Sequence, residues 1–225
     1  ADLVLLNGAG YARWTGRVSL PPSRLVDTSA ALSDATIAVA AATVHSHGPG
    51  GDHSHTGTAF TTWLDFSQAA SQADAIHQAL AGKRPQLADE FERNYIDLKK
   101  DLLALDQSLR AVVTANKELP LLASHPVYQY LARRYALNLR SVMWEPGQLP
   151  AEAEWAAFEQ MLETHPASNM LWEGEPLQET VTRLEALGIH SIVFEPAGTR
   201  PEQGDFMTEM KHNIGNLATA YKLAE

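Results

Sequence analysis

The sequence predicts an α/β protein with a mostly parallel sheet. Short β-branched, apolar segments alternate with amphipathic segments of about 10 to 15 residues in the second half of the chain, a rhythm typical of βαβ units. The chain opens on an apolar segment, Leu3–Leu6, that leads into a glycine turn. A helical pattern of apolar residues runs through residues 85–116 and predicts one long helix.

The first part of the chain predicts short strands. Leu3–Leu6 is expected to be a buried strand, and Arg24–Thr28 a short one. Ala35–Val44 is rich in Val, Ile, Thr and Ala, and this composition fits either a strand or a buried helix. The stretch that follows, up to Thr58, is rich in glycine, so we expect a loop there.

Two helices are predicted next. The first covers Asp65–Leu80, and the second begins at Pro85, in a first turn where proline is tolerated, and runs to about Asn116. Apolar residues recur every three or four positions along the second helix. Its length is roughly 45 Å at 1.5 Å per residue. Such a helix either ties two lobes together or belongs to a plain helical bundle.

The second half is expected to alternate strands with helices. The predicted strands are Leu119–Ala123, Arg140–Trp144, Asn169–Trp172 and Ile189–Phe194, and the predicted helices are Pro126–Tyr135, Ala151–Glu163, Pro176–Leu187 and Gly204–Ala224. Ligands of parallel sheets bind beyond the carboxyl ends of the strands. His125, Glu145 and Glu195 each lie at or just past such an end, so they are candidate site residues.

Composition limits the chemistry. The 225 residues are 45% hydrophobic and 20% charged, as in an ordinary globular protein. A net charge of −10 argues against a nucleic-acid partner, because phosphate contacts need a basic face. The chain has no cysteine, which fits an exported protein and leaves histidine and carboxylate as the ligands for any metal.

Histidines concentrate in the stretch HSHGPGGDHSH, residues 45–55. Its two His-x-His pairs, His45/His47 and His53/His55, hold four of the nine histidines. The stretch is either a metal-binding segment or a polar loop with no fixed ligand set. His125 is either a metal ligand or a helix cap in a polar pocket. The other four histidines are expected at the surface: His77, His165, His190 and His212.

Motifs for other chemistries are missing from the sequence. It contains no G-x-S-x-G, no G-x-x-x-x-G-K-[ST] and no H-E-x-x-H. The glycines of Asn7–Trp14 lack the G-x-G-x-x-G spacing of a dinucleotide site. A zinc hydrolase would need an open coordination position and a general base, and no clear His/Glu pair supplies one.

Several segments, taken together, resemble one family. They are ADLVLLNGAG (1–10), the histidine-rich stretch, TTWLDFSQA (61–69), SHPVYQYLARRYAL (124–137), MWEP (143–146), VFEPAG (193–198) and GDFMTEMKHNIGNLATA (204–220). In these segments the chain is similar to the metal-binding substrate-binding proteins of zinc and manganese ABC transporters, the cluster A-I family. The resemblance covers nearly the whole chain.

The resemblance implies a fold of two α/β lobes joined by a long linking helix. Residues 1–64 would be the remainder of an incomplete first lobe with the histidine-rich loop, 65–117 the linking helices and 118–225 the second lobe. The protein would be a periplasmic monomer that captures a divalent metal ion, zinc or else manganese or another divalent metal, for a membrane ABC permease. It would not be an enzyme. We expect an N-terminal part of the fold and an export signal to be missing from this chain.

The resemblance also implies a ligand set of histidines and carboxylates. His125 matches the ligand of the second lobe, and Glu195 stands where the family has an aspartate. Thr61 occupies the position of the histidine that lies two residues before Trp63. Another histidine would lie upstream of residue 1. We therefore expect His53 or His55 to replace a missing ligand, ahead of His45 and His47.

Two other functions remain open. One is a binding or adhesion protein on the same scaffold, with a degenerate metal site or a different ligand. The other is a zinc-dependent enzyme. Histidine ligation further predicts that metal affinity falls as the pH drops through about 6.5, because only neutral imidazole binds a metal.

Overall fold

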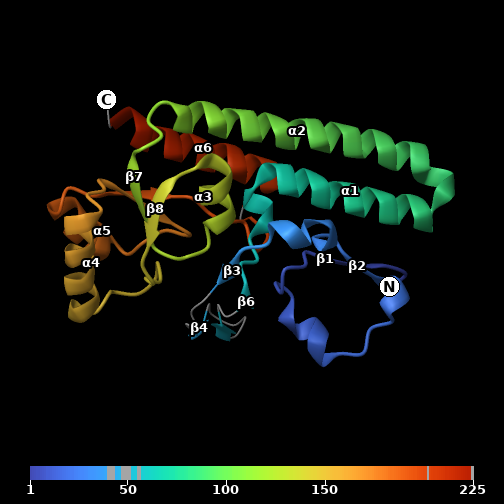
Figure 1. The fold of residues 1–225 in the computed structure, drawn as a ribbon, viewed down its shortest axis with the longest axis horizontal. Helices are drawn as coiled ribbons and strands as arrows, with labels where there is room; N and C mark the ends of the chain where they lie inside the picture. The colour runs from blue at the N-terminus through green and yellow to red at the C-terminus, as the bar shows by residue number, and fades with distance from the viewer. Residues whose placement is uncertain (40–43, 47–51, 55–56, 202, 224–225) are drawn as a thin grey trace. The chain divides into compact units, whose positions relative to one another are not determined.

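The computed structural model describes residues 1–39, 44–46, 52–54, 57–201 and 203–223 (Figure 1). The chain divides into two compact units, Ala1–Ala104 and Leu105–Glu225. The boundary between the units falls within the long helix α2 (Ala88–Thr114). The predicted α/β class, with a parallel sheet and a long helix, is confirmed.

The first unit contains three short strand pairs. β1 (Val4–Leu6) pairs in parallel with β2 (Leu25–Asp27), which confirms both predicted strands. The expected burial of the first strand is wrong, since Leu5 is 40% exposed. β3 (Ala38–Val39) pairs antiparallel with β6 (Gly57–Thr58). Within the segment 35–44, for which a strand or a helix was left open, Ala38 and Val39 therefore form a strand, whereas Ala35 ends a 3₁₀ turn. In the described part of this region, 3₁₀ turns lie at η1 (Arg13–Arg17), η2 (Pro22–Arg24) and η3 (Ala30–Ala35).

The histidine-rich stretch is not a loop throughout. β4 (Val44–Ser46) and β5 (Asp52–Ser54) form an antiparallel pair in which His45 is the backbone partner of His53. The prediction of a loop is therefore wrong for these residues. In an antiparallel pair the backbone N–H and C=O groups of the two segments bond to each other. The high glycine content of the stretch predicted a loop and gave no sign of this pairing.

Two helices form an antiparallel hairpin in the first unit (Figure 1). α1 (Phe66–Lys83) follows the 3₁₀ turn η5 (Thr62–Leu64), and the Asp65 side chain caps it by accepting hydrogen bonds from the N–H groups of Ser67 and Gln68. Proline lies in a separate turn, η6 (Pro85–Leu87), and the long helix begins at Ala88. The expected single helix from Pro85 therefore starts one turn later.

His77 connects the two helices of this hairpin. Its Nε2 lies 3.0 Å from Glu92 Oε2, and its ring stacks on Tyr95 at 5.0 Å and 3°. The imidazole is half-buried between α1 and α2, so the prediction that His77 is a surface residue is wrong. The partners of His77 lie on the other helix, α2, so the pattern of α1 alone could not predict these contacts.

The second unit is built on a four-stranded parallel sheet. Its strand order is β10-β9-β7-β8, so β7 lies between β9 and β8 and the edges are β10 and β8. The strands are β7 (Pro120–Ala123), β8 (Asn138–Ser141), β9 (Asn169–Trp172) and β10 (His190–Val193). The helices are α3 (Gln129–Tyr135), α4 (Glu152–Thr164), α5 (Gln178–Ala186) and α6 (Phe206–Leu223).

The elements of this unit follow the predicted order. β9 has the predicted bounds, whereas β8 lies earlier in the chain than the expected strand at 140–144. Beyond Ser141 the backbone still bonds to the β7 side, since the N–H groups of Val142 and Trp144 donate to the carbonyls of Ala123 and Ser124. α3 begins later than expected because the residues after His125 form a turn that precedes the helix.

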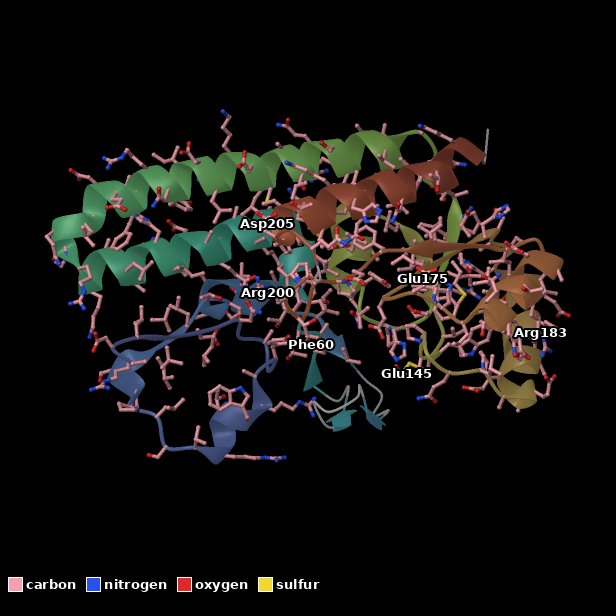
Figure 2. The ribbon with its side chains drawn as sticks, turned by 180° about the vertical axis from the view of Figure 1, so that it is seen from behind. Phe60, Glu145, Glu175, Arg183, Arg200 and Asp205 are labelled. Atoms are coloured by element: carbon pink, nitrogen blue, oxygen red, sulfur yellow. The ribbon has the colours of Figure 1, made fainter. Side chains whose placement is uncertain are left out.

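Aromatic side chains form the core beside the sheet. The ring centroid of Trp144 lies 4.6 Å from that of Trp155 and 4.7 Å from that of Phe158, both on α4. Arg183 of α5 covers the outer side: its guanidinium lies 4.3 Å from the centre of the Trp155 ring, and Nη1 lies 2.7 Å from Glu152 Oε1 (Figure 2). These contacts hold α4 and α5 against each other.

The remaining histidines divide into two groups. His165 is buried, and its Nε2 lies 2.9 Å from the Leu121 carbonyl oxygen, so the prediction of a surface position is wrong. His190 and His212 are exposed, as predicted. His165 follows α4 directly and reaches the central strand, where a backbone carbonyl satisfies the ring.

Candidate metal centre

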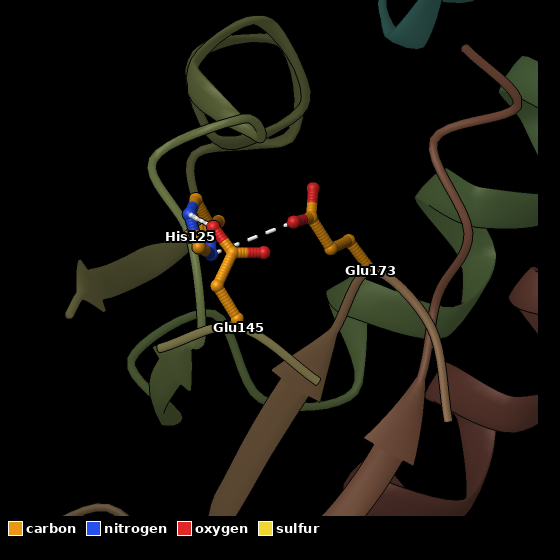
Figure 3. A group of neighbouring side chains, drawn as sticks. All are labelled: His125, Glu145 and Glu173. Carbon is orange, nitrogen blue, oxygen red and sulfur yellow. Dashed lines mark ion pairs between the residues drawn. The ribbon is translucent and has the colours of Figure 1, made fainter. Parts of the chain in front are cut away.

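Three titratable side chains meet at one edge of the parallel sheet. His125 follows β7, Glu145 follows β8 and Glu173 follows β9 directly (Figure 3). The carboxyl ends of parallel strands lie at the same edge, and ligands bind there in open α/β sheets. Because β7 lies between β8 and β9, the residues that follow these three strands become neighbours.

The distances within this group suit a shared cation. His125 Nε2 lies 3.4 Å from Glu145 Oε1, and His125 Nδ1 lies 3.5 Å from Glu173 Oε1. One donor atom from each residue falls within 4.8 Å of the others, and no other such group of three histidines or carboxylates occurs among the described residues. Imidazole nitrogen and carboxylate oxygen are ligand types of zinc, manganese and nickel sites.

The backbone fixes the tautomer of His125. Nδ1 lies 3.0 Å from the carbonyl oxygen of Trp144, and a carbonyl can only accept, so the hydrogen is on Nδ1. In the neutral ring, the lone pair is then on Nε2, on the side of Glu145. Histidine ligands of metals are commonly oriented in this way by a partner on the other ring nitrogen.

Burial and charge favour a cation at this position. The His125 side chain is fully buried, and those of Glu145 and Glu173 are 18% and 14% exposed. Two carboxylates close to one imidazole repel each other in a partly dry environment, and a cation between them relieves that repulsion. The group is therefore complementary to a metal ion and unfavourable for an anion.

Glu195 lies at the same sheet edge but outside this group. It follows β10, which is separated from β7 by β9, and neighbouring strands are about 4.8 Å apart. Burial, together with the negative charges of Glu173 and Glu195, raises the pKa of Tyr128 well above its usual value. Glu195 also lines an open pocket of about 710 Å³ next to α6.

The other predicted site residues lie in the first unit. His45 and His53 are backbone partners in the β4–β5 pair, whereas His47 and His55 lie outside the described residues. Thr61, which stands at an expected histidine position, is buried and immediately precedes η5. The described residues thus assign no metal contact to the histidine-rich stretch, and the expectation for His53 and His55 stays a prediction.

Glu173 is the site residue that the sequence analysis missed. It directly follows the strand Asn169–Trp172, which was predicted with the observed bounds. The rule that selected His125, Glu145 and Glu195 applies equally to Glu173. The sequence signal for Glu173 is therefore its place directly after a predicted strand.

A sequence model of one protein family matches nearly the whole chain: "ZnuA: Zinc-uptake complex component A periplasmic" matches residues 1–220. In addition, a protein of Chlamydia muridarum (strain MoPn / Nigg) named "Putative metal-binding protein" is 30% identical over 74 residues. That match spans 33% of this chain and 27% of the relative.

Solved structures share the fold. The metal-dependent lipoprotein YcdH from Bacillus subtilis matches with a TM-score of 0.79 at 18% identity, over 98% of this chain and 80% of its own. FpvC from Pseudomonas aeruginosa, solved in complex with Mn²⁺, matches with a TM-score of 0.75 at 21% identity, over 100% of this chain and 81% of its own. At these identities the similarity establishes the fold alone.

Proposed function

We propose, from the premise that the chain belongs to the ZnuA family of periplasmic zinc-uptake proteins, that it captures a divalent transition metal ion and delivers it to a membrane ABC permease. Zinc is the first candidate, and manganese or another divalent metal is the next. The observation that carries this proposal is the convergence of His125, Glu145 and Glu173 at the carboxyl edge of the sheet.

The three residues would divide the work of binding. In the proposed site, Nε2 of His125 and a carboxylate oxygen of Glu145 are direct ligands, because they face each other at 3.4 Å. Glu173 lies on the Nδ1 side of the ring, where it adds negative charge and helps to orient the imidazole. Glu195 is proposed as a further carboxylate ligand, and water fills positions that the protein leaves open.

This donor set explains how the metal would be held and released without a chemical step. Neutral imidazole and ionised carboxylates bind the ion, so protons compete with it. A net charge of −10 attracts cations and speeds their encounter with the protein. No bond in a substrate is made or broken, and the proposed protein is therefore a carrier and not an enzyme.

The proposed setting is the periplasm, with the chain acting as a monomer. Family membership supports this location. Among the described residues, no helix has both the length and the apolar character needed to cross a bilayer. The permease is proposed as the membrane partner, in keeping with a carrier that releases its ion at the membrane.

Titration calorimetry of the chelator-treated chain tests the proposal. We expect saturable binding of zinc at one ion per chain, with manganese and nickel as competitors. His125→Ala should weaken zinc binding at least about tenfold, because ligand-sphere changes commonly cost 10- to 100-fold in affinity. His212→Ala is the matched control, since His212 is exposed and lies outside the group. Absence of metal binding by the wild type would refute the proposal and leave a metal-independent binding protein.

A further inference from the structure

The strand end that carries Glu195 is held by side chains from other elements. Each of three successive carbonyl groups accepts a hydrogen bond from a side chain. The donors are Asn216 Nδ2 to Val193 at 3.0 Å, Tyr128 OH to Phe194 at 2.7 Å and Asn213 Nδ2 to Glu195 at 2.7 Å. Because β10 is an edge strand, the bonds to Val193 and Glu195 replace partners that a further strand would offer, whereas Phe194 faces β9, where its N–H donates to the Trp172 carbonyl.

Asn213 binds both backbone groups of Glu195. Its Nδ2 donates to the Glu195 carbonyl, and its Oδ1 accepts from the Glu195 N–H at 3.0 Å. The Asn213 side chain is fully buried in α6. An amide side chain supplies a donor and an acceptor side by side, so a single residue fixes the peptide groups on both sides of the Glu195 Cα atom.

The position that Asn213 fixes matters for the metal centre. Glu195 is at the sheet edge shared with His125, Glu145 and Glu173, and the Tyr128 hydroxyl donates to the carbonyl of Phe194, the residue just before it. A metal ligand is effective only when its donor atom is held near the binding geometry by supporting contacts. The backbone of Glu195 has such support from the terminal helix.

We infer that Asn213 is a positioning residue for metal capture, which acts through the backbone of Glu195 and keeps this carboxylate available to the ion bound at His125 and Glu145. The inference rests on the proposed function. It assigns α6 a part in the metal site, although no residue of α6 belongs to the group of three that converges at the sheet edge.

A double-mutant cycle in the full chain tests this role, with zinc affinity measured by titration calorimetry and stability by thermal unfolding. We expect Asn213→Ala to weaken zinc binding about tenfold, within the range typical of residues that support a ligand. In a Glu195→Gln background, the same substitution should change the affinity by less than about twofold. If Asn213→Ala fails to fold, Asn213→Asp replaces it, since it retains an acceptor for the Glu195 N–H, while its second oxygen takes the place of the donor and adds a negative charge.

Asn216→Ala is the matched control. It removes one bond from α6 to the same strand, at Val193, and should lower stability without changing zinc affinity. If the wild type binds no zinc, both the proposed function and the inference fail. If the wild type binds zinc, the inference alone is overturned by any of three results: unchanged affinity of the Asn213 variant, an equal loss in the Glu195→Gln background, or no effect of Glu195→Gln itself.

Discussion

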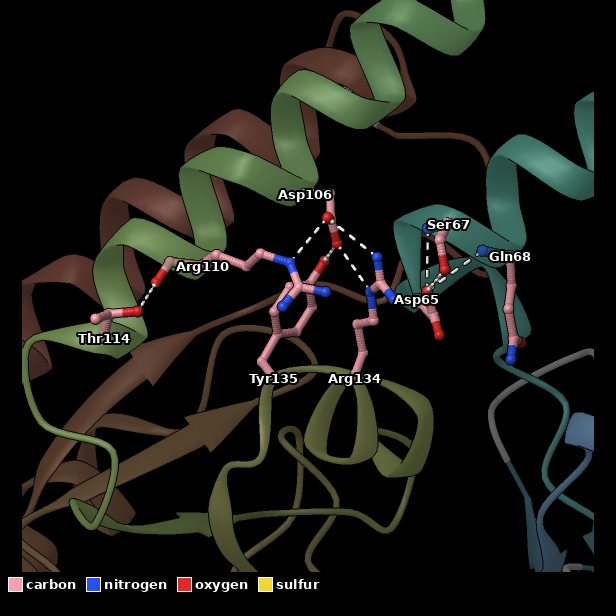
Figure 4. A network of polar contacts seen from close by, with 8 residues as sticks. All are labelled: Asp65, Ser67, Gln68, Asp106, Arg110, Thr114, Arg134 and Tyr135. Carbon is pink, nitrogen blue, oxygen red and sulfur yellow. Dashed lines mark hydrogen bonds and ion pairs between the residues drawn. The ribbon is translucent and has the colours of Figure 1, made fainter.

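Replacing Asp106 with alanine should destabilise the second unit strongly. Asp106 lies on α2, and its buried carboxylate accepts four hydrogen bonds (Figure 4). Oδ1 accepts from Arg134 Nε at 3.0 Å and from Tyr135 OH at 2.9 Å, while Oδ2 accepts from Arg134 Nη2 at 3.1 Å and from Arg110 Nε at 3.0 Å. The carboxylate thus ties α2 to α3, the helix that follows the His125 turn.

The size of the expected loss in the free energy of unfolding follows from these contacts. The bidentate bond to Arg134, whose side chain is 27% exposed, contributes about 1.5–3 kcal/mol as a charge-assisted pair. The Tyr135 hydroxyl, buried with its side chain, loses its partner at a cost of about 1–3 kcal/mol. Arg110 is 48% exposed, so its pair adds only about 0.5 kcal/mol. Together these contributions reach about 3–6.5 kcal/mol, and breaking a buried pair costs about 3–5 kcal/mol. Asp106→Ala should lower the free energy of unfolding by about 3–5 kcal/mol, where the two ranges overlap.

Urea unfolding at neutral pH measures this effect, with Arg110→Ala as the control that should cost under about 1 kcal/mol. Burial acts to raise the pKa of Asp106, but the hydrogen bonds from Arg134, Arg110 and Tyr135 outweigh it and lower the pKa. A carboxyl whose folded pKa is lowered stabilises the fold above its unfolded pKa. The difference between wild type and Asp106→Ala should therefore shrink as the pH falls below about 4. A loss under 1 kcal/mol at neutral pH would refute the reasoning.

Three further predictions concern metal binding, each measured by zinc titration. Glu145→Gln should weaken zinc binding more than Glu173→Gln, because Glu145 faces the Nε2 lone pair of His125. Glu175→Gln is the control and should have no effect, since Glu175 is exposed. Equal losses of affinity in all three variants would contradict the assigned roles. The double substitution of His53 and His55 with alanine should lower the affinity, and unchanged affinity would remove these histidines from the ligand set. Affinity should be lower at pH 5.5 than at pH 7.5, because imidazole protonates near pH 6.5; equal affinities would exclude histidine ligation.

The order of elements in the second unit could be predicted from the sequence because each element has its own local pattern. In the run Asn169–Trp172, three apolar residues follow Asn169 and end at the charged Glu173, and all four residues are buried as β9. The rule for strand ends then selected His125 and Glu145 from these segments. Periodicity and strand ends are local properties, so a single sequence is enough to recognise them.

The convergence of particular side chains could not be predicted, since it depends on strand order. The order β10-β9-β7-β8 places Glu145 and Glu173 on either side of His125 and leaves Glu195 one strand further away. Chain order would instead suggest that β7 and β9 are separated by β8. His77 and His165 were wrongly predicted to lie at the surface. Their partners, Glu92 and Leu121, lie on other elements, and the pattern of a single element does not reveal such contacts.

Trp144 links the aromatic core of the second unit to the proposed metal centre, so metal affinity is expected to depend on packing in this core. The side chain of Trp144 lies against Trp155 and Phe158. Its backbone N–H donates to the Ser124 carbonyl at 2.8 Å, and its own carbonyl accepts from His125 Nδ1 at 3.0 Å. The aromatic contacts thus hold in place the carbonyl that sets the histidine tautomer. A substitution in this core that replaces none of the proposed ligands is therefore expected to shift the Trp144 carbonyl and, through it, the His125 ring. The direction in which the Nε2 lone pair faces the ion then changes.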